Sequence, residues 1–250
     1  MPETPIYIQD YVPHTPTRPE KGQRPKSVHR TAPKIGNPTP LGLSAFALSV
    51  FVLSIYNLGA FGIAIPNVIV GVSLFTGGVV QFAAGMWEFK VGNTFGGTGF
   101  SAFGGFWASY GAIFIPGFGI QQAFGFTTDI HGMIQPPNPN NITNAADLMF
   151  QYHNSLAVYC LGWLIFTFIF TLACIRTNAG VLGAFVALTL SFGFEVVYHF
   201  FPASEVFIKI SGVFGIICSI FVYYCLAGVL LTPDLSPISL PLWDLSKKDS

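Results

Sequence analysis

The residues of this chain that could move protons or hold a carboxyl group are polar side chains inside otherwise apolar segments. The ionisable ones are Glu88, Glu195 and His199, and the last two stand four residues apart, so they share one face of a helix. A Glu–His pair can relay protons, or it can lie at a membrane interface with both head groups reaching water. Glu88, close to Lys90, can likewise be proton-linked or a solvated helix end. The neutral groups that we assign to a substrate path are Asn57, Gln81, Asn93, Thr94 and Thr98.

Other kinds of chemistry find no support in the sequence. There is no nucleotide-binding or hydrolase motif, and His131 and His153 have no neighbours at zinc-ligand spacing. The four cysteines lie in apolar runs, which is typical of buried small hydrophobes rather than disulfides or metal ligands. With 11 basic and 11 acidic residues, the chain carries no net charge to attract nucleic acid. We therefore expect no enzyme activity, no cofactor, no metal and no nucleic-acid partner.

The elements that must position these side chains are six apolar stretches. Only 9% of the 250 residues are charged, whereas a soluble domain carries about a quarter. Each stretch is close to the roughly 20 residues that a helix needs to cross a bilayer, and none alternates like a barrel strand. We therefore predict an all-α membrane protein, a channel, carrier or receptor, with six transmembrane helices at about Leu41–Ala64, Val68–Phe89, Thr94–Ile115, Ser155–Ile175, Gly180–Phe200 and Val206–Leu231.

The chain divides into three parts. Residues 1–36 hold seven prolines and six Lys or Arg, which predicts a disordered tail. Residues 37–232 form the six-helix domain, with a long loop at 116–154, and residues 233–250 form a C-terminal tail. Ten of the 11 basic residues fall on one side of this topology, so both termini are predicted to be cytoplasmic and the loop extracellular. The loop carries an N-glycosylation sequon at Asn141.

Glycine recurs every seven residues in the second and third stretches. Seven residues are two helical turns, so each set lies on one face of its helix. Small residues let helix backbones approach closely within a membrane. We expect these two helices to pack along the faces formed by Gly71, Gly78 and Gly85 and by Gly97, Gly104 and Gly111.

Two segments resemble those of the acetate uptake transporter family. They are "NPTPLGLSAF", which starts at Asn37, and "QFAAGMWEFKVGNTFGGTGF", which starts at Gln81. That family includes bacterial succinate–acetate/proton symporters and fungal ammonia and acetate transport proteins. The resemblance covers roughly residues 37–232 and implies a six-helix protomer similar to the acid-activated urea channel fold. It also implies a pore in each protomer and a ring of protomers, a hexamer. The signature residues are Asn37, Pro38, Pro40 and Gly42.

The resemblance further implies a hydrophobic constriction in the pore, and the register places it at Phe46, Phe103 and Leu188. The bacterial relatives have Tyr at the position of Phe103, so this ring lacks one hydroxyl. Because a neutral weak acid loses little hydration at an apolar ring, we expect acetate and propionate to pass better than dicarboxylates. The expected protein is a proton-linked plasma-membrane transporter or channel for acetate and similar monocarboxylates, surrounded by lipid. An ammonia or ammonium exporter and an acid-sensing regulator without flux remain as alternatives.

Overall fold

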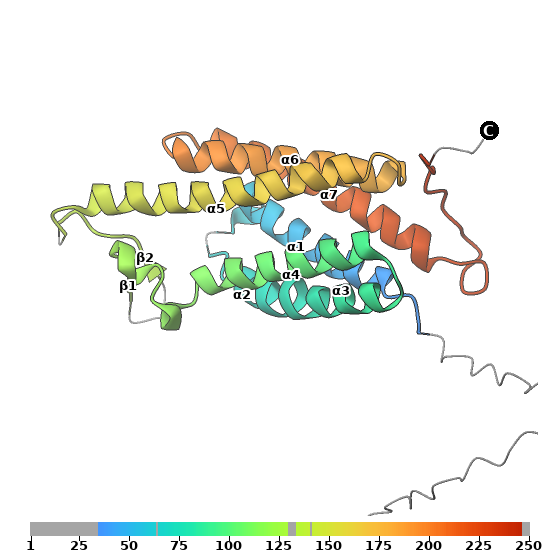
Figure 1. Cartoon of the computed structure of the whole chain (residues 1–250). Coiled ribbons are helices and arrows are strands. Elements are labelled where there is room, and N and C mark those ends of the chain that lie inside the picture. The colour runs from blue at the N-terminus through green and yellow to red at the C-terminus, as the bar shows by residue number, and fades with distance from the viewer. Residues whose placement is uncertain (1–34, 64, 130–133, 141, 247–250) are drawn as a thin grey trace, which may run out of the picture. The chain divides into compact units, whose positions relative to one another are not determined.

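The computed structural model describes residues 35–63, 65–129, 134–140 and 142–246, and they form a helical bundle (Figure 1). The predicted disorder of residues 1–34 and the sequon at Asn141 lie outside this part of the chain. The elements are α1 (Thr39–Asn57), the 3-10 turn η1 (Ala60–Gly62), α2 (Val68–Gly71), the π-helical segment η2 (Val72–Val80), α3 (Gln81–Lys90), α4 (Thr94–Ile113), the 3-10 turns η3 (Pro116–Phe118) and η4 (Gln122–Phe124), the antiparallel pair β1 (Thr127–Thr128) and β2 (Ile134–Gln135), α5 (Ala145–Ala173), α6 (Ala179–Phe200) and α7 (Val206–Leu230).

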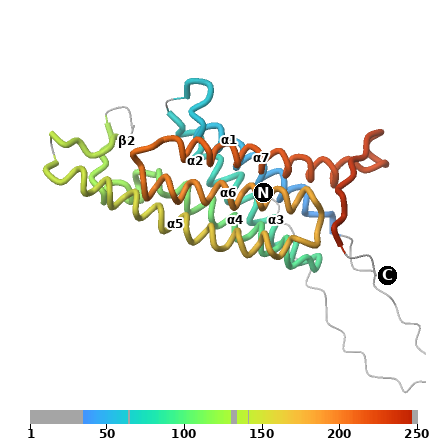
Figure 2. The backbone as a smooth tube through the Cα atoms, turned by 90° about the horizontal axis from the view of Figure 1, so that it is seen from above, coloured from blue at the N-terminus to red at the C-terminus, as the bar shows by residue number. Residues whose placement is uncertain are grey.

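Helix α1 lies between two groups of helices (Figure 1). It packs against α7 on one side and against η2 and α3 on the other, while α5 packs on α6 and α4 on α3. Figure 2 shows the same neighbours side by side when the bundle is turned by 90°. We call the end at which α1 begins and α3 finishes the tail end, and the end that carries η3, η4, β1 and β2 the loop end.

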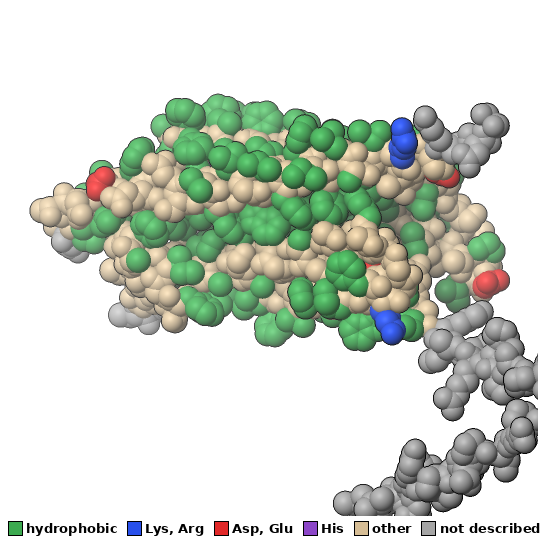
Figure 3. Space-filling model, viewed as in Figure 1, with side chains coloured by type: hydrophobic (Ala, Val, Ile, Leu, Met, Phe, Trp, Pro, Cys, Tyr) green, Lys and Arg blue, Asp and Glu red, His purple; other side chains and the backbone are tan. Residues whose placement is uncertain are grey.

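Five helices in the described part are long and apolar enough to cross a membrane. They are α1, the continuous helix from α2 through η2 to α3, α5, α6 and α7. Helix α4 also has 20 residues and runs along the bundle, but six of them are glycine, which lowers its hydropathy. On the face shown in Figure 3, hydrophobic side chains are spread along the whole length between the two ends. The prediction of an all-α membrane protein is therefore confirmed, and the count of six spans stays a prediction.

Two helix boundaries differ from those expected. Helix α1 finishes at Asn57 rather than near residue 64, because Gly59 and Gly62 take left-handed backbone angles of φ +65° and +67°. Helix α5 begins at Ala145, ten residues before the expected start at Ser155. Its first turns are polar, so hydropathy did not reveal them. The connection from α4 to α5 is correspondingly shorter than the predicted loop at 116–154.

The glycine faces of the second and third long helices meet as predicted. A Cβ at Gly104 would lie 2.8 Å from the backbone nitrogen of Phe82, and one at Gly111 would lie 3.0 Å from the Cβ of Ser73. Gly71 is the exception, because a Cβ added there would have no other atom within 4 Å. The close approach holds α4 firmly against η2 and α3, so the side chains on its opposite face point toward α1, α5 and α6.

Candidate substrate pathway

Two cavities follow one another between α1, α4 and α6. The larger, of about 330 Å³, lies toward the tail end, and the smaller, of about 30 Å³, lies toward the loop end. Of the residues that the structure describes, only Phe46, Phe103 and Leu188 line both cavities. The structure thus brings together, from three helices, the three side chains that the resemblance selected. Their role as a constriction stays a prediction.

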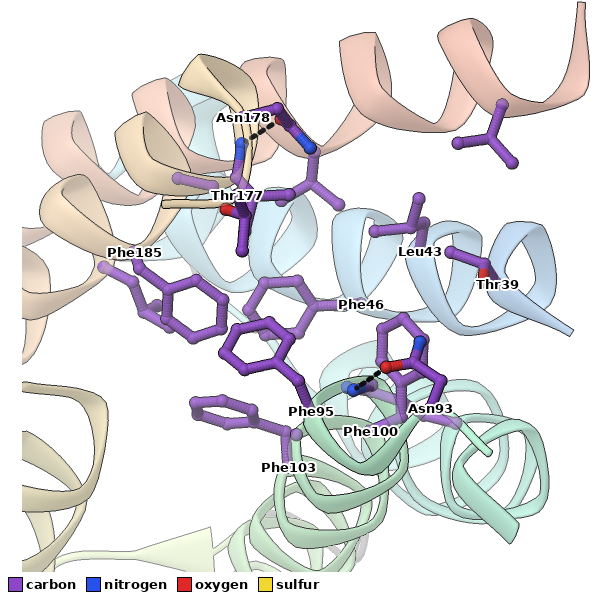
Figure 4. Close-up of a pocket in the computed structure, with 18 residues that line it drawn as sticks. Thr39, Leu43, Phe46, Asn93, Phe95, Phe100, Phe103, Thr177, Asn178 and Phe185 are labelled. Carbon is purple, nitrogen blue, oxygen red and sulfur yellow. Dashed lines mark hydrogen bonds between the residues drawn. The ribbon is translucent and has the colours of Figure 1, made fainter. Parts of the chain in front are cut away.

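The boundary between the cavities is apolar and aromatic. The rings of Phe46 and Phe103 lie with their centres 5.3 Å apart, and Phe103 also packs against Trp163 and Phe166. Figure 4 shows the rings of Phe46, Phe103 and Phe185 gathered at one side of the larger cavity. Phe103 is only 2% exposed and Leu188 5%. A hydrophobic narrowing of this kind opposes the passage of hydrated ions.

Gln81 is the polar group that the larger cavity leaves without a protein partner. Its side chain is fully buried, and neither Nε2 nor Oε1 makes a hydrogen bond within the described part of the chain. A buried amide without partners costs about 1–3 kcal/mol, so the site favours an occupant that supplies a donor and an acceptor. Gln81 directly follows the π-helical segment η2, and such widened helical turns occur frequently at functional sites.

Glu88 anchors two groups at the mouth of the larger cavity. Its carboxylate accepts hydrogen bonds from Thr39 Oγ1 at 2.5 Å and from Asn93 Nδ2 at 2.7 Å. Thr39 and Asn93 line the cavity. The alternative that Glu88 is a solvated helix end is wrong, because the residue is 1% exposed. Glu88 does not itself line the cavity, and it therefore positions Thr39 and Asn93, which do.

The "NPTPLGL" segment sets the start of α1. Asn37 Oδ1 accepts a hydrogen bond from the backbone N–H of Thr39 at 3.0 Å, and Pro40 occupies the first turn of the helix. Gly42 leaves room for the ring of Phe100, which reaches across from α4. Since Phe46 follows only six residues after Pro40, the rigid start of the helix fixes the depth and facing of that ring.

The smaller cavity contains the second buried carboxyl group. Glu195 lines it and is 8% exposed, and Asn57 lines the same space. Ser54 and Ser191 line the same space. The cavity therefore offers neutral donors around one ionisable group, on the loop side of the aromatic boundary.

The structure gives His199 a different partner from the one that its spacing suggested. Its Nδ1 faces Nδ1 of His153 at 3.2 Å, while Glu195 lines the smaller cavity. Whether Glu195 and His199 relay protons or form an interfacial pair stays a prediction. His153 lies 46 positions earlier, on another helix, so no local spacing could have revealed it.

Two of the predicted path residues lie away from these cavities. Thr94 is exposed at the first position of α4, and Thr98 is half-buried one turn later. Neither lines the larger or the smaller cavity. Asn93, in contrast, lines the larger cavity and caps α4 by accepting a hydrogen bond from the N–H of Gly96 at 3.0 Å (Figure 4).

Sequence reasoning missed the connection between α5 and α6, which forms another wall of the larger cavity. Thr177 and Asn178 line it, and Asn178 Oδ1 accepts from the N–H of Val181 at 2.9 Å (Figure 4). The C-terminal segment holds this connection in place. The N–H of Ala179 donates to the carbonyl of Trp243, and the N–H of Leu245 donates to the carbonyl of Thr177, both at 3.0 Å. Polar loops that fold back on a bundle carry no periodic signal.

Apolar helices surround two cavities, and aromatic side chains form the boundary between these cavities. This arrangement places the chain in the class of helical membrane transport proteins. Residues 21–247 match the model of the GPR1/FUN34/yaaH family, and the chain belongs to that family. The fold is similar to that of a solved structure described as the bacterial acetate channel SatP. The TM-score is 0.66 at 28% identity, over 84% of this chain and 99% of the channel.

Curated fungal relatives are also similar to this chain. Accumulation of dyads protein 2 of Saccharomyces cerevisiae is 41% identical over 83% of the chain, and ammonia transport outward protein 2 of the same yeast is 38% identical over 88%. Acetate permease A of Emericella nidulans is 37% identical over 79% of the chain. The chain spans 65%, 71% and 63% of the lengths of these three relatives, respectively.

Proposed function

We propose that this protein is a transporter or channel that carries acetate and similar short monocarboxylates across a membrane with a linked proton. The observation that carries the proposal is the pair of cavities whose only common lining residues are Phe46, Phe103 and Leu188. Relatives named as an acetate permease and as an acetate channel support the choice of substrate. They also support a transport protein rather than an enzyme.

The chemistry of the larger cavity favours a neutral acid. The amide of Gln81 can donate from Nε2 to the carbonyl oxygen of a carboxylic acid and accept its O–H at Oε1. A carboxylate has only acceptors, so it would leave Oε1 without a partner. The neutral acid also loses less hydration at the aromatic ring. A short carboxylic acid with a pKa between about 4 and 5 is partly neutral in a mildly acidic medium, and crossing in this form carries the proton with the anion.

The surroundings of the protein are part of the proposal. The surface between the two ends is apolar and suits lipid or neighbouring protomers, and a hexameric ring with one path in each protomer is the assembly that the sequence resemblance implies. Lys90 and Arg176 lie at or just beyond the ends of α3 and α5 that reach the tail end. Basic residues there support a plasma-membrane protein with the tail end in the cytoplasm.

Substrate size tests the constriction. Purified protein in liposomes, with pH and voltage set independently, is assayed for uptake of labelled acetate, propionate and butyrate. Leu188→Ala removes three carbons where the cavities meet and is expected to raise butyrate uptake relative to acetate several-fold. Leu190→Ala is the matched control, because Leu190 lies on the same helix but is 41% exposed. An unchanged ratio in Leu188→Ala would remove these residues from the path.

Ammonia is the second candidate substrate. An apolar ring with neutral polar groups on both sides also suits a small neutral base, and one relative is named as an ammonia transport outward protein. Measuring acetate influx and ammonia efflux in the same liposomes separates the two candidate substrates. Our proposal expects Leu188→Ala to change the uptake of carboxylic acids. Liposomes that move neither solute would support the acid-sensing regulator instead.

A further inference from the structure

We propose that His153 and His199 form a binding site for a divalent cation of the zinc type at the loop end of the bundle. His199 is the last residue but one of α6, and His153 lies nine residues into α5. Their Nδ1 atoms face each other at 3.2 Å, and both side chains are half-buried. The pair joins two neighbouring helices and lies away from the two cavities that the proposed transport uses.

The distance between the two nitrogens suits a shared metal ion. Zinc binds imidazole nitrogens at about 2.0–2.1 Å, so two ligands in a tetrahedral shell lie about 3.3–3.4 Å apart. The observed 3.2 Å differs from this by a few tenths of an ångström. The ring centres are 5.4 Å apart, so the imidazoles meet nitrogen to nitrogen rather than stacked face to face. Rotation of the two rings would bring both lone pairs onto one ion.

Without a metal, the same contact requires a proton. Two Nδ1 atoms at this distance form a hydrogen bond only when one carries a hydrogen and the other presents its lone pair. A metal ion replaces that hydrogen and uses both lone pairs. Imidazole ligands select Zn²⁺, Cu²⁺ and Ni²⁺ over Mg²⁺ and Ca²⁺, which prefer oxygen.

Among the residues that the structure describes, two side chains are placed to act as ligands of this site. The described part of the chain contains no group of three or more His, Cys, Asp or Glu side chains placed to hold one ion. Water would complete the coordination shell, so the affinity would be moderate and the ion exchangeable. The aromatic rings of Tyr152 and Tyr198 pack on His153 and fix the orientation of its ring.

The consequence for transport rests on the proposed function. Helix α6 carries Glu195 one turn before His199, and Leu188 about three turns before it. An ion that joins α5 to α6 at the loop end would restrain the helix that supplies both side chains, and it would slow acetate flux. Binding itself does not depend on what the protein transports.

Binding is measured by titrating the purified full-length protein with Zn²⁺ and, separately, with Mg²⁺, using calorimetry. The wild type is expected to bind one Zn²⁺ per chain and no Mg²⁺ at this site. His153→Gln and His199→Gln are each expected to weaken Zn²⁺ binding about ten-fold or more, since each removes a ligand. Gln151→Ala is the control, because Gln151 is exposed on the same helix two residues before His153, and it should leave binding unchanged. Equal Zn²⁺ affinity in all four proteins would overturn the site.

X-ray absorption at the zinc edge of the wild type gives an answer that no variant can confound. Two imidazole nitrogens at about 2.0–2.1 Å are expected, and a shell of oxygen alone would overturn the site even if a variant failed to fold. Acetate flux is then measured with and without Zn²⁺. Slower flux with Zn²⁺ in the wild type but not in His199→Gln supports inhibition of transport by the bound ion. Equal flux with and without Zn²⁺ in the wild type refutes it. A protein that binds Zn²⁺ but never moves acetate would refute the proposed function and leave the metal site standing.

Discussion

Replacing Glu88 by Gln tests whether a buried carboxylate organises the mouth of the larger cavity. Glu88 is 1% exposed and accepts hydrogen bonds from Thr39 Oγ1 and Asn93 Nδ2 at 2.5 and 2.7 Å. Hydrogen bonds to a charged group contribute about 1.5–3 kcal/mol and neutral ones about 0.5–1.5 kcal/mol. The Gln side chain keeps both partners with neutral bonds, so Glu88→Gln is expected to cost about 2 kcal/mol.

Thermal unfolding of the purified protein in detergent measures this cost. For a chain of this size about 2 kcal/mol corresponds to a fall in Tm of about 4–8 °C. Glu205→Gln is the control, because Glu205 pairs with Lys209 at 3.1 Å with side chains 75% and 52% exposed, and such surface pairs contribute little. Thr39→Val removes one of the two bonds to the carboxylate outright and should cost a similar amount, about 1.5–3 kcal/mol.

The double variant decides whether Thr39 and Glu88 act as one unit. Because Glu88→Gln and Thr39→Val weaken the same bond, their combined effect should be smaller than the sum of the two single effects. Full additivity, or a Tm of Glu88→Gln within about 1 °C of the control, would falsify the reasoning. It would mean that the short contacts at Glu88 do not contribute to stability.

Three further substitutions test other parts of the structure. Gln81→Leu keeps the bulk but removes the unpartnered amide, so the concentration of acetate that half-saturates uptake should rise about ten-fold, whereas Gln151→Leu on the exposed side of α5 should leave it unchanged. Gly104→Ala should lower the Tm, because a Cβ added at Gly104 would lie 2.8 Å from the backbone of Phe82. Gly105→Ala should leave the Tm unchanged, because a Cβ added at Gly105 would have no other atom within 4 Å. Trp243→Ala should speed proteolysis of the C-terminal segment, because it removes the ring stacked on Tyr224 at 5.5 Å, and Leu235→Ala, at a 78% exposed residue, should not.

Local patterns in the sequence predicted those features that arise within one helix. The length and apolarity of the stretches located the long helices, and the seven-residue glycine spacing predicted the face on which α4 packs. Gln81 was noticed because a polar residue in an apolar helix is rare and expensive, and its place in a substrate path stays a prediction. The signature at Asn37 likewise predicted where α1 begins, to within two residues.

Features that depend on two separate helices could not be predicted in the same way. Glu88 looked like a helix end near Lys90, and only the packing of α1 against α3 shows that Thr39 covers it. The partner of His199 is 46 residues away, on the neighbouring helix α5. A pattern along one helix describes the faces of that helix, whereas a contact between helices depends on their rotation and depth.

On the proposed function, the arrangement of the two cavities would explain why polar groups and an apolar ring occur together along one path. A path lined only by aromatic rings would leave the carboxyl group without hydrogen-bond partners over its whole length, and a path lined only by polar groups would pass water and ions. Here Gln81 lies on the tail side of Phe46 and Phe103, and Asn57 with Glu195 lies on the loop side. A neutral acid would be unpartnered only while it passes the ring itself, a step much shorter than the membrane is thick. Charged species would meet their largest cost at the same step, so the ring would select for the protonated form.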